Sequence, residues 1–273
     1  KIKPGTFKLV IIDAFYRSAL SAANRFHCVS HYDETGLALA ARRDIVEAGL
    51  APERVNALAR TLEKAVFAVT GKGQTLYFGG VPALYPGCQV ITGGDPGKAL
   101  EVLGFADAAK NVLARFSKAV AASKCKTLVV AEPSSYDFLK DRLPGVKVVH
   151  CAEFLLPSVV KTRRTRRAVY LESDVLRNYC GNPSAPRDLL QKAGFTLVPF
   201  GTNDEESHAV GEGAVVYDAL NPELSEKLCA RVYALAADVG KALFITASAS
   251  VRDTLRKHNP KFDIATLEEA LSS

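Results

Sequence analysis

Residues 127–140 read TLVVAEPSSYDFLK, and this stretch decides the fold class. Its first part, Thr127–Val130, is apolar on both faces, as a parallel strand covered by helices must be. The residues from Pro133 onward are expected to form a short helix. A buried strand that leads directly into a helix is typical of α/β proteins, in which strands and helices alternate and crossovers are right-handed.

A second copy of this stretch follows later in the chain, because residues 129–140 have a counterpart in residues 245–256. One common spacing aligns three pairs of residues in the two copies: Asp137 with Asp253, Leu139 with Leu255, and Leu155 with Leu271. Leu76–Phe78 and Val169–Leu171 are the expected first strands of the two copies. The sequence therefore predicts an α/β protein with two duplicated βαβ-type units and parallel sheets.

The predicted units divide the chain into three parts. Residues 1–75 form a mostly helical N-terminal region, residues 76–160 the first unit and residues 161–273 the second unit. In each unit a glycine precedes a longer expected helix: Gly97 comes before Asp107–Ala122, and Gly211 before Pro222–Gly240.

Within the N-terminal region, the apolar run at Lys8–Ile12 is expected to be a short buried strand. Apolar residues recur at roughly helical spacing from Thr35 to Gly71. Gly49 suits the end of a first helix, and Pro52 fits the first turn of a second helix at Glu53–Val69.

The composition is that of an ordinary globular protein, with 48% hydrophobic and 23% charged residues among 273. No uncharged apolar run reaches the roughly 18 residues of a membrane span. Lys1–Lys8 carries no signal-peptide pattern, so a cytoplasmic location is expected. The densest basic stretch, Lys161–Arg167, could attract phosphates or an acidic partner, but the preferred interpretation is a solvated linker between the two halves of the fold. It lacks interleaved aromatic residues, and no nucleic-acid binding is predicted.

Six cysteines are scattered at irregular spacings, and none forms a CxxC pair. Neither a zinc site nor a disulfide framework is indicated. A ligand site in an open α/β sheet lies at the carboxyl ends of the strands. The segments there are Gly79–Pro82, Ala131–Ser135, Glu172–Val175 and Thr246–Val251.

These segments resemble the ligand-bearing motifs of the cysteine-rich CCG-domain family, which includes heterodisulfide reductase subunits and the iron–sulfur proteins of glycolate oxidase and lactate utilisation. The resemblance covers about residues 40–273 and includes residues that are not ligands in the family. In the second unit it rests on Tyr170–Arg177, Ala185–Leu190, Asn203–Gly213 and Thr246–Val251. In the first unit it rests on Tyr77–Val81, Asp95–Gly97, Glu132–Tyr136, His150 and Glu153–Leu155.

The family binds [4Fe–4S]-type clusters through cysteines, but no thiol remains at the matching positions of this chain. The first unit offers Val81, Asp95, Pro96, Glu132 and Ser135; the second offers Asp174, Ala209, Val210, Ser248 and Val251. Iron–sulfur clusters need thiolate ligands, so no cluster and no metal ligand are expected in this chain. The resemblance thus implies a degenerate, cluster-free protein that acts as a structural or docking component beside a protein partner in an electron-transfer complex.

Two alternatives remain open, and so does the question of enzymatic activity. The chain could be an oxidoreductase subunit whose iron–sulfur cofactors lie on a partner or on a region outside this sequence. Alternatively, the vacated pockets could bind a small molecule or a non-cluster metal, or an anion at Gly211 and Gly213. In that case Asp174, Glu205, His208 and Ser248 are expected to converge. The candidate cofactor positions are Asp174, Glu205, His208, Gly211, Ser248, Glu132 and Asp95. A hydrolase that uses Ser248, His208 and Asp174 has no nucleophile-elbow signature.

Overall fold

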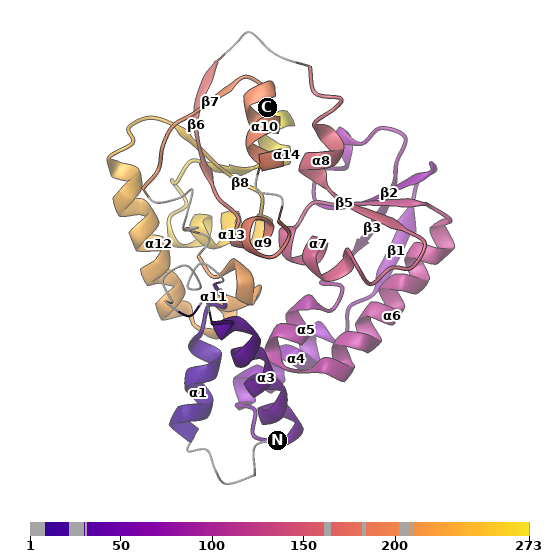
Figure 1. The fold of residues 1–273 in the computed structure, drawn as a ribbon, viewed down its shortest axis with the longest axis vertical. Coiled ribbons are helices and arrows are strands. Elements are labelled where there is room, and N and C mark those ends of the chain that lie inside the picture. Colours follow the sequence, from indigo (N-terminus) through magenta and orange to yellow (C-terminus); the bar gives the residue numbers. More distant parts are fainter. Residues whose placement is uncertain are drawn as a thin grey trace.

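A computed structural model describes residues 9–21, 30, 32–160, 165–181, 184–201, 208 and 210–272. These residues form a mixed α/β protein with two separate sheets and a helical N-terminal part (Figure 1). The fold class predicted from the sequence is confirmed.

The first sheet has the strand order β1-β3-β2-β4-β5. All of its pairings are parallel except that of the edge strand β1, which runs antiparallel to β3. Its strands are β1 (Phe67–Thr70), β2 (Thr75–Phe78), β3 (Gln89–Gly93), β4 (Thr127–Val130) and β5 (Lys147–His150). Its helices are η1 (Pro82–Leu84), α5 (Lys98–Leu103), α6 (Ala106–Ser123), α7 (Pro133–Leu139) and α8 (Cys151–Leu155).

The second sheet has the order β7-β6-β8-β9 and is parallel throughout. Its strands are β6 (Arg166–Leu171), β7 (Phe195–Leu197), β8 (Leu243–Thr246) and β9 (Ile264–Thr266). Its helices are α9 (Asp174–Asn178), α10 (Ser184–Lys192), η2 (Glu212–Ala214), α11 (Tyr217–Leu220), α12 (Pro222–Ala237), α13 (Ala249–His258) and α14 (Leu267–Ser272).

The two sheets repeat one topology. In the order of the chain, β2, β3, β4 and β5 correspond to β6, β7, β8 and β9, and the corresponding strands hold the same places in the two sheets. A helix follows each equivalent strand, α7 after β4 and α13 after β8. The internal duplication that the spacing of Asp137 and Asp253 indicated is therefore present in the architecture.

The N-terminal part differs from the expectation in two places. Residues 9–12 belong to helix α1 (Leu9–Arg17) and not to a strand. Ile12 and Tyr16 lie four residues apart and are both buried, while Ile11 is 44% exposed, which is the pattern of an amphipathic helix. The predicted helix Glu53–Val69 is also too long: α4 (Glu53–Leu62) ends early, and β1 follows it and extends the first sheet.

Other N-terminal features agree with the sequence pattern. Gly49 follows α3 (Glu34–Glu47) with φ +70°, and Pro52 directly precedes α4. The buried guanidinium of Arg42 donates hydrogen bonds to the carbonyl oxygens of Phe15, Ser18 and Val102, at 3.0, 3.0 and 2.7 Å. Arg42 thereby joins the N-terminal segment and α3 to α5 of the first unit.

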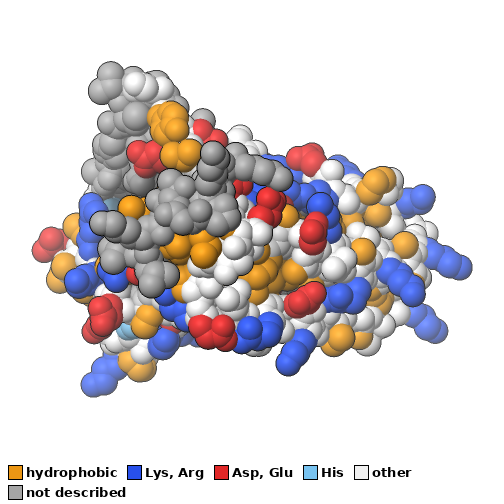
Figure 2. All heavy atoms as spheres, turned by 90° about the horizontal axis from the view of Figure 1, so that it is seen from below, with side chains coloured by type: hydrophobic (Ala, Val, Ile, Leu, Met, Phe, Trp, Pro, Cys, Tyr) orange, Lys and Arg blue, Asp and Glu red, His pale blue; other side chains and the backbone are white. Residues whose placement is uncertain are grey.

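One hydrophobic cluster joins the two sheets. A single cluster of buried side chains takes Tyr77 and Val129 from the first sheet and Tyr170 and Ile245 from the second. None of the helices formed by the described residues is long and apolar enough to cross a membrane. Viewed from the end at which α1 and α3 lie in Figure 1, positive and negative side chains are interspersed around apolar ones (Figure 2).

Candidate functional site

A cavity of about 710 Å³ lies between the two units. The segments that follow β2, β3 and β4 line one side of it, and the first residues of α13 and α14 line the other. Val81, Asp95, Glu132 and Ser135 all face this cavity. Four of the five first-unit positions singled out in the sequence are thus brought together. The fifth, Pro96, is buried beside them but does not line the cavity.

Glu132 joins the two units directly. Its Oε1 accepts hydrogen bonds from Ser248 Oγ at 2.5 Å and Ser250 Oγ at 3.3 Å, and its Oε2 accepts one from the Ala249 backbone N–H at 2.8 Å. The carboxylate therefore satisfies the first turn of α13, in the manner of a capping residue supplied by another element. Burial raises the pKa of Glu132, and the hydrogen bonds from Ser248 and Ala249 oppose that shift.

Asp95 has a local structural role as well as its place on the cavity wall. Its Oδ1 accepts hydrogen bonds from the backbone N–H groups of Gly97 and Ala99, both at 2.8 Å, and so starts α5. Burial raises the pKa of Asp95, while these two bonds lower it. Gly97 has φ +126°, and an added Cβ would lie 2.8 Å from the Ala109 carbonyl oxygen, so this turn requires glycine.

Two serines at the start of α7 present hydroxyl groups to the cavity. Ser134 and Ser135 are only 2% and 5% exposed and both line it. Neither side chain is hydrogen-bonded to any residue that the structure describes. Since buried hydroxyl groups are normally hydrogen-bonded, these two are available to a bound molecule.

A second buried carboxylate, Glu268, lines the opposite wall. It accepts hydrogen bonds from the Tyr77 hydroxyl at 2.8 Å and from the Tyr85 hydroxyl at 2.5 Å. The two tyrosine rings are stacked with their centroids 3.9 Å apart. Burial raises the pKa of Glu268, and also that of the neighbouring Cys151 thiol, which disfavours the thiolate form.

Sequence reasoning did not identify Glu268, Tyr85 or Cys151 as site residues. The internal duplication contains one feature that could have pointed to Glu268. The spacing that aligns Leu155 with Leu271 also places Glu268 opposite Ala152, so a carboxylate stands at a position that is apolar and buried in the first unit.

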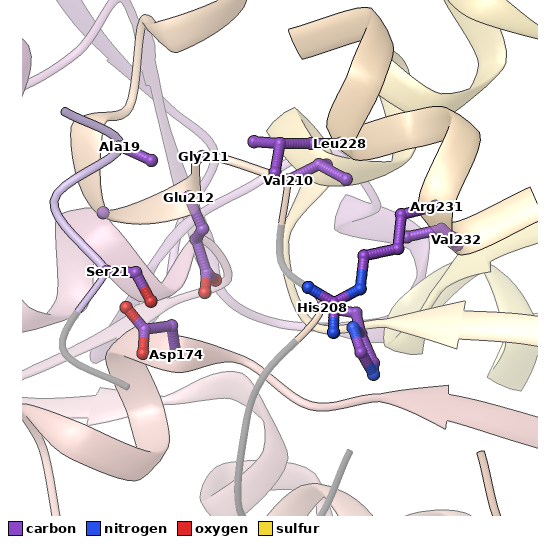
Figure 3. Close-up of a pocket in the computed structure, with 11 residues that line it drawn as sticks. Ala19, Ser21, Asp174, His208, Val210, Gly211, Glu212, Leu228, Arg231 and Val232 are labelled. Atoms are coloured by element: carbon purple, nitrogen blue, oxygen red, sulfur yellow. The ribbon is translucent and has the colours of Figure 1, made fainter. Parts of the chain in front are cut away.

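The second-unit candidates occupy a different and much smaller cavity, of about 100 Å³ (Figure 3). Asp174, His208 and Gly211 line it together with Glu212 and Arg231. Ser248 does not join them, so the expected convergence on one pocket is wrong for this residue. Ser248 is fully buried and acts as the N-cap of α13, because its Oγ accepts the Val251 N–H and donates to Glu132. Glu205 lies outside the described residues.

Glu212 is a buried carboxyl group on the wall of this smaller cavity. It accepts hydrogen bonds from Ser173 Oγ at 2.8 Å and from the Val175 N–H at 3.3 Å. Burial raises its pKa to about 8. Gly213, beside it, is explained by packing, since an added Cβ would lie 2.2 Å from the Leu20 carbonyl oxygen. A close approach of the N-terminal segment, rather than an anion, accounts for this glycine.

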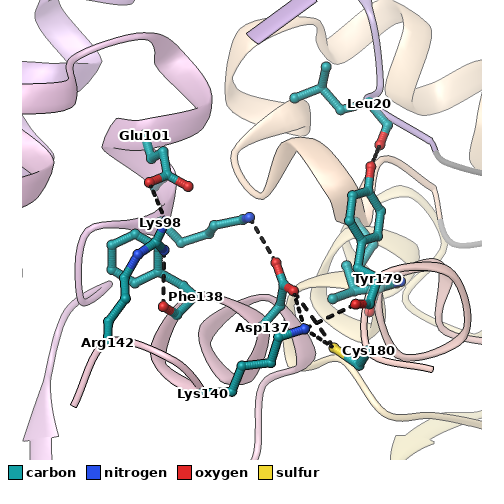
Figure 4. Close-up of polar contacts among 12 residues, drawn as sticks. Leu20, Lys98, Glu101, Asp137, Phe138, Lys140, Arg142, Tyr179 and Cys180 are labelled. Carbon is teal, nitrogen blue, oxygen red and sulfur yellow. Dashed lines mark hydrogen bonds and ion pairs between the residues drawn. The ribbon is translucent and has the colours of Figure 1, made fainter. Parts of the chain in front are cut away.

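A polar network on the other side of α7 joins the units again (Figure 4). Asp137 is paired with Lys98 and Lys140, each at 3.0 Å, and Lys140 also donates to the Tyr179 carbonyl oxygen at 3.0 Å. Burial acts to raise the pKa of Asp137, but the two lysines outweigh it and the pKa is lowered. Burial raises the pKa of the adjacent Cys180 thiol to about 12.

Among the described residues, no group of three or more His, Cys, Asp or Glu side chains is placed to hold a metal ion. The five described cysteines are free thiols, and Cys151 is the one among them that lines the cavity; Cys28 lies outside the described residues. In comparisons with known proteins, no protein-family model matches the chain and no curated protein matches it.

Proposed function

We propose that this chain is a degenerate, cluster-free relative of the cysteine-rich CCG-domain proteins. We further propose that the cavity of about 710 Å³ between its two units binds a small organic molecule. One observation carries the proposal. Val81, Asp95, Glu132 and Ser135, which stand where the family carries thiolates, line a cavity of about 710 Å³. Pockets for small molecules typically measure about 300–1,000 Å³.

The chemistry of these side chains argues against a cluster and for an organic ligand. Valine cannot ligate iron through its side chain, and carboxylates and hydroxyls are hard ligands, whereas iron–sulfur clusters are held by soft thiolates. The walls combine apolar side chains, such as Phe78 and Ile91, with a few polar groups at fixed positions. Glu132 ties the wall to the second unit, so the cavity keeps its shape without a cluster.

A variant that fills the cavity tests the proposal. Gly80 lies at the cavity wall with φ outside the left-handed region, and an added Cβ would meet no heavy atom within 4 Å. Gly80→Leu should therefore fold and obstruct the cavity. Ala122→Leu, on the exposed end of α6, adds the same side chain elsewhere and is the matched control.

The measurement is thermal unfolding in the presence of amines, carboxylates, sugars and nucleosides. We expect at least one class to raise the Tm of the wild type and of Ala122→Leu, but not that of Gly80→Leu. Ligands that stabilise all three proteins equally, or no stabilisation by any class, would contradict the proposal.

A second candidate function is a structural or docking component of an electron-transfer complex that contains a protein partner. It is favoured by exposed apolar side chains on the N-terminal helices, where Ile11 is 44% and Leu37 is 53% exposed. Cross-linking mass spectrometry in extract of the native host tests it. Specific cross-links from α3 to an iron–sulfur protein, lost in Leu37→Asp, are expected. Cross-links that persist in the variant would contradict this candidate.

A further inference from the structure

We infer that the occupant of the 710 Å³ cavity is a linear aliphatic diamine or polyamine. This inference rests on the proposed function and names the class of its ligand. Three independent features of the cavity wall carry it: the sign of its charge, its apolar surface, and two hydroxyl groups that have no partner among the described residues.

The charged side chains on the wall are mostly negative. Carboxyl groups come from five residues: Asp95, Glu132, Asp253, Glu268 and Glu269. Arg252 is the one basic side chain among the described lining residues, and it is already paired with Asp253 at 2.7 Å and with Glu269 at 2.6 Å. The wall therefore has a negative potential that favours a cation.

The buried carboxylates have neutral partners. Glu132 is held by Ser248, Ser250 and a backbone N–H, and Glu268 by two tyrosine hydroxyls. Neutral donors stabilise a carboxylate but leave its charge uncompensated, so an ammonium group that enters the cavity gains from an attraction that no described side chain supplies. Burial raises the pKa values of Glu132 and Glu268, and the hydrogen bonds from these neutral donors oppose the shift.

The placement of the carboxyl groups favours an elongated ligand. Asp95 follows β3, Glu132 follows β4, Asp253 lies on α13 and Glu268 lies on α14, so the negative groups are distributed around the cavity. Between them the wall is apolar, with Phe78, Val81 and Leu267 among its residues. Ammonium groups separated by a hydrocarbon chain match this alternation, because the chain can lie on the apolar surface.

The hydroxyl groups complete the match. Ser134 and Ser135 are 2% and 5% exposed, line the cavity, and have no hydrogen-bond partner among the described residues. An ammonium group has three donors and no acceptor, whereas a serine hydroxyl offers two acceptor lone pairs. A bound ammonium group would therefore donate to hydroxyls that have no partner among the residues the structure describes.

Isothermal titration calorimetry with three probes of similar length tests the inference: hexamethylenediamine, hexanediol and adipate. We expect saturable binding of the diamine to the wild type and to Ala122→Leu. Gly80→Leu should weaken this binding about tenfold or more. Ser135→Ala, which removes one acceptor, should weaken it about threefold to tenfold.

The possible outcomes distinguish an error in the class of ligand from an error in the proposed binding cavity. Binding of adipate or hexanediol that depends on Gly80, without binding of the diamine, would overturn the amine assignment and leave the proposed pocket standing. Diamine binding that is unchanged in Gly80→Leu would place the amine on surface carboxylates and overturn the inference. No diamine binding to the wild type would overturn it as well. The proposal that the cavity binds a small molecule is overturned only if the thermal-unfolding experiment also finds no ligand whose stabilising effect is lost in Gly80→Leu.

Discussion

Glu132 accepts a 2.5 Å hydrogen bond from Ser248 Oγ, and these two residues occupy equivalent positions in the two duplicated units. Both follow the strand that pairs with the first strand of its unit, Glu132 after β4 and Ser248 after β8. Glu132 and Ser248 could each have faced a separate ligand in its own unit, but they are hydrogen-bonded to one another. The contact therefore connects the units and fixes one wall of the cavity between them.

Glu132→Gln should destabilise the protein. The substitution removes the charge that three donors share and places an NH2 group among them, and we expect the free energy of unfolding to fall by about 2–4 kcal/mol. Urea unfolding followed by circular dichroism measures this loss. Glu226→Gln, on an exposed position of α12, is the matched control and should change stability by less than about 0.5 kcal/mol. Equal stabilities of the two variants would show that the contact with α13 contributes little.

Glu212 should make stability fall as the pH rises. Burial raises its pKa from 4.5 to about 8, so the folded state holds this proton at a pH where the unfolded state has released it. The stabilisation is complete below the unfolded pKa and is lost as the pH rises through about 8. Urea midpoints at about pH 5 and about pH 9 should therefore differ less in Glu212→Gln than in the wild type. The same difference in both proteins would refute this role.

His150 should remain neutral to unusually low pH. Its Nδ1 accepts the Ala152 N–H at 3.2 Å, and its Nε2 lies 3.2 Å from the Ala131 carbonyl oxygen, to which only a protonated Nε2 can donate. Burial lowers the pKa of His150 to about 4. In ¹⁵N NMR spectra we expect an unprotonated Nδ1 and a protonated Nε2 down to about pH 5. Titration of this ring near its ordinary value of 6.5 would contradict the described packing.

Tyr85→Phe should leave Glu268 with one tyrosine donor instead of two. Because the carboxylate is buried, we expect a loss of about 1–3 kcal/mol in the free energy of unfolding. Tyr233→Phe, which removes a hydroxyl that donates to the Leu255 carbonyl oxygen outside the cavity, serves as the comparison. If ring packing alone mattered at position 85, Tyr85→Phe would be neutral, and Glu268 would not depend on the pair of tyrosines.

The strands of the two sheets could be predicted from the sequence because they are short, apolar and repeated. Thr127–Val130 is a strand with the predicted bounds, and the spacing of Asp137 and Asp253 indicated the duplication. The run at Leu9–Ile12 was misassigned because a short apolar run does not distinguish a strand from a buried helix. Only the packing of Ile12 and Tyr16 against the core decides for the helix.

Part of the candidate site could be predicted from the sequence. Strand ends located Asp95 and Glu132 at the cavity, since the carboxyl ends of parallel strands meet at one edge. The pairing of Glu132 with Ser248 was not foreseeable, because these residues are 116 positions apart and meet only through the way the two sheets pack together. The same holds for Glu268, whose tyrosine partners come from the other unit.

We propose that the cavity between the units binds an organic ligand and holds no iron–sulfur cluster. Anaerobic reconstitution with iron and sulfide tests the absence of a cluster directly. Bound iron, bound sulfide and visible absorption are then measured on the desalted protein. We expect no thiolate-to-iron charge-transfer absorption and no stoichiometric iron, because valine, aspartate, proline, glutamate and serine stand at the first-unit positions. Stoichiometric iron and sulfide with that absorption would contradict it.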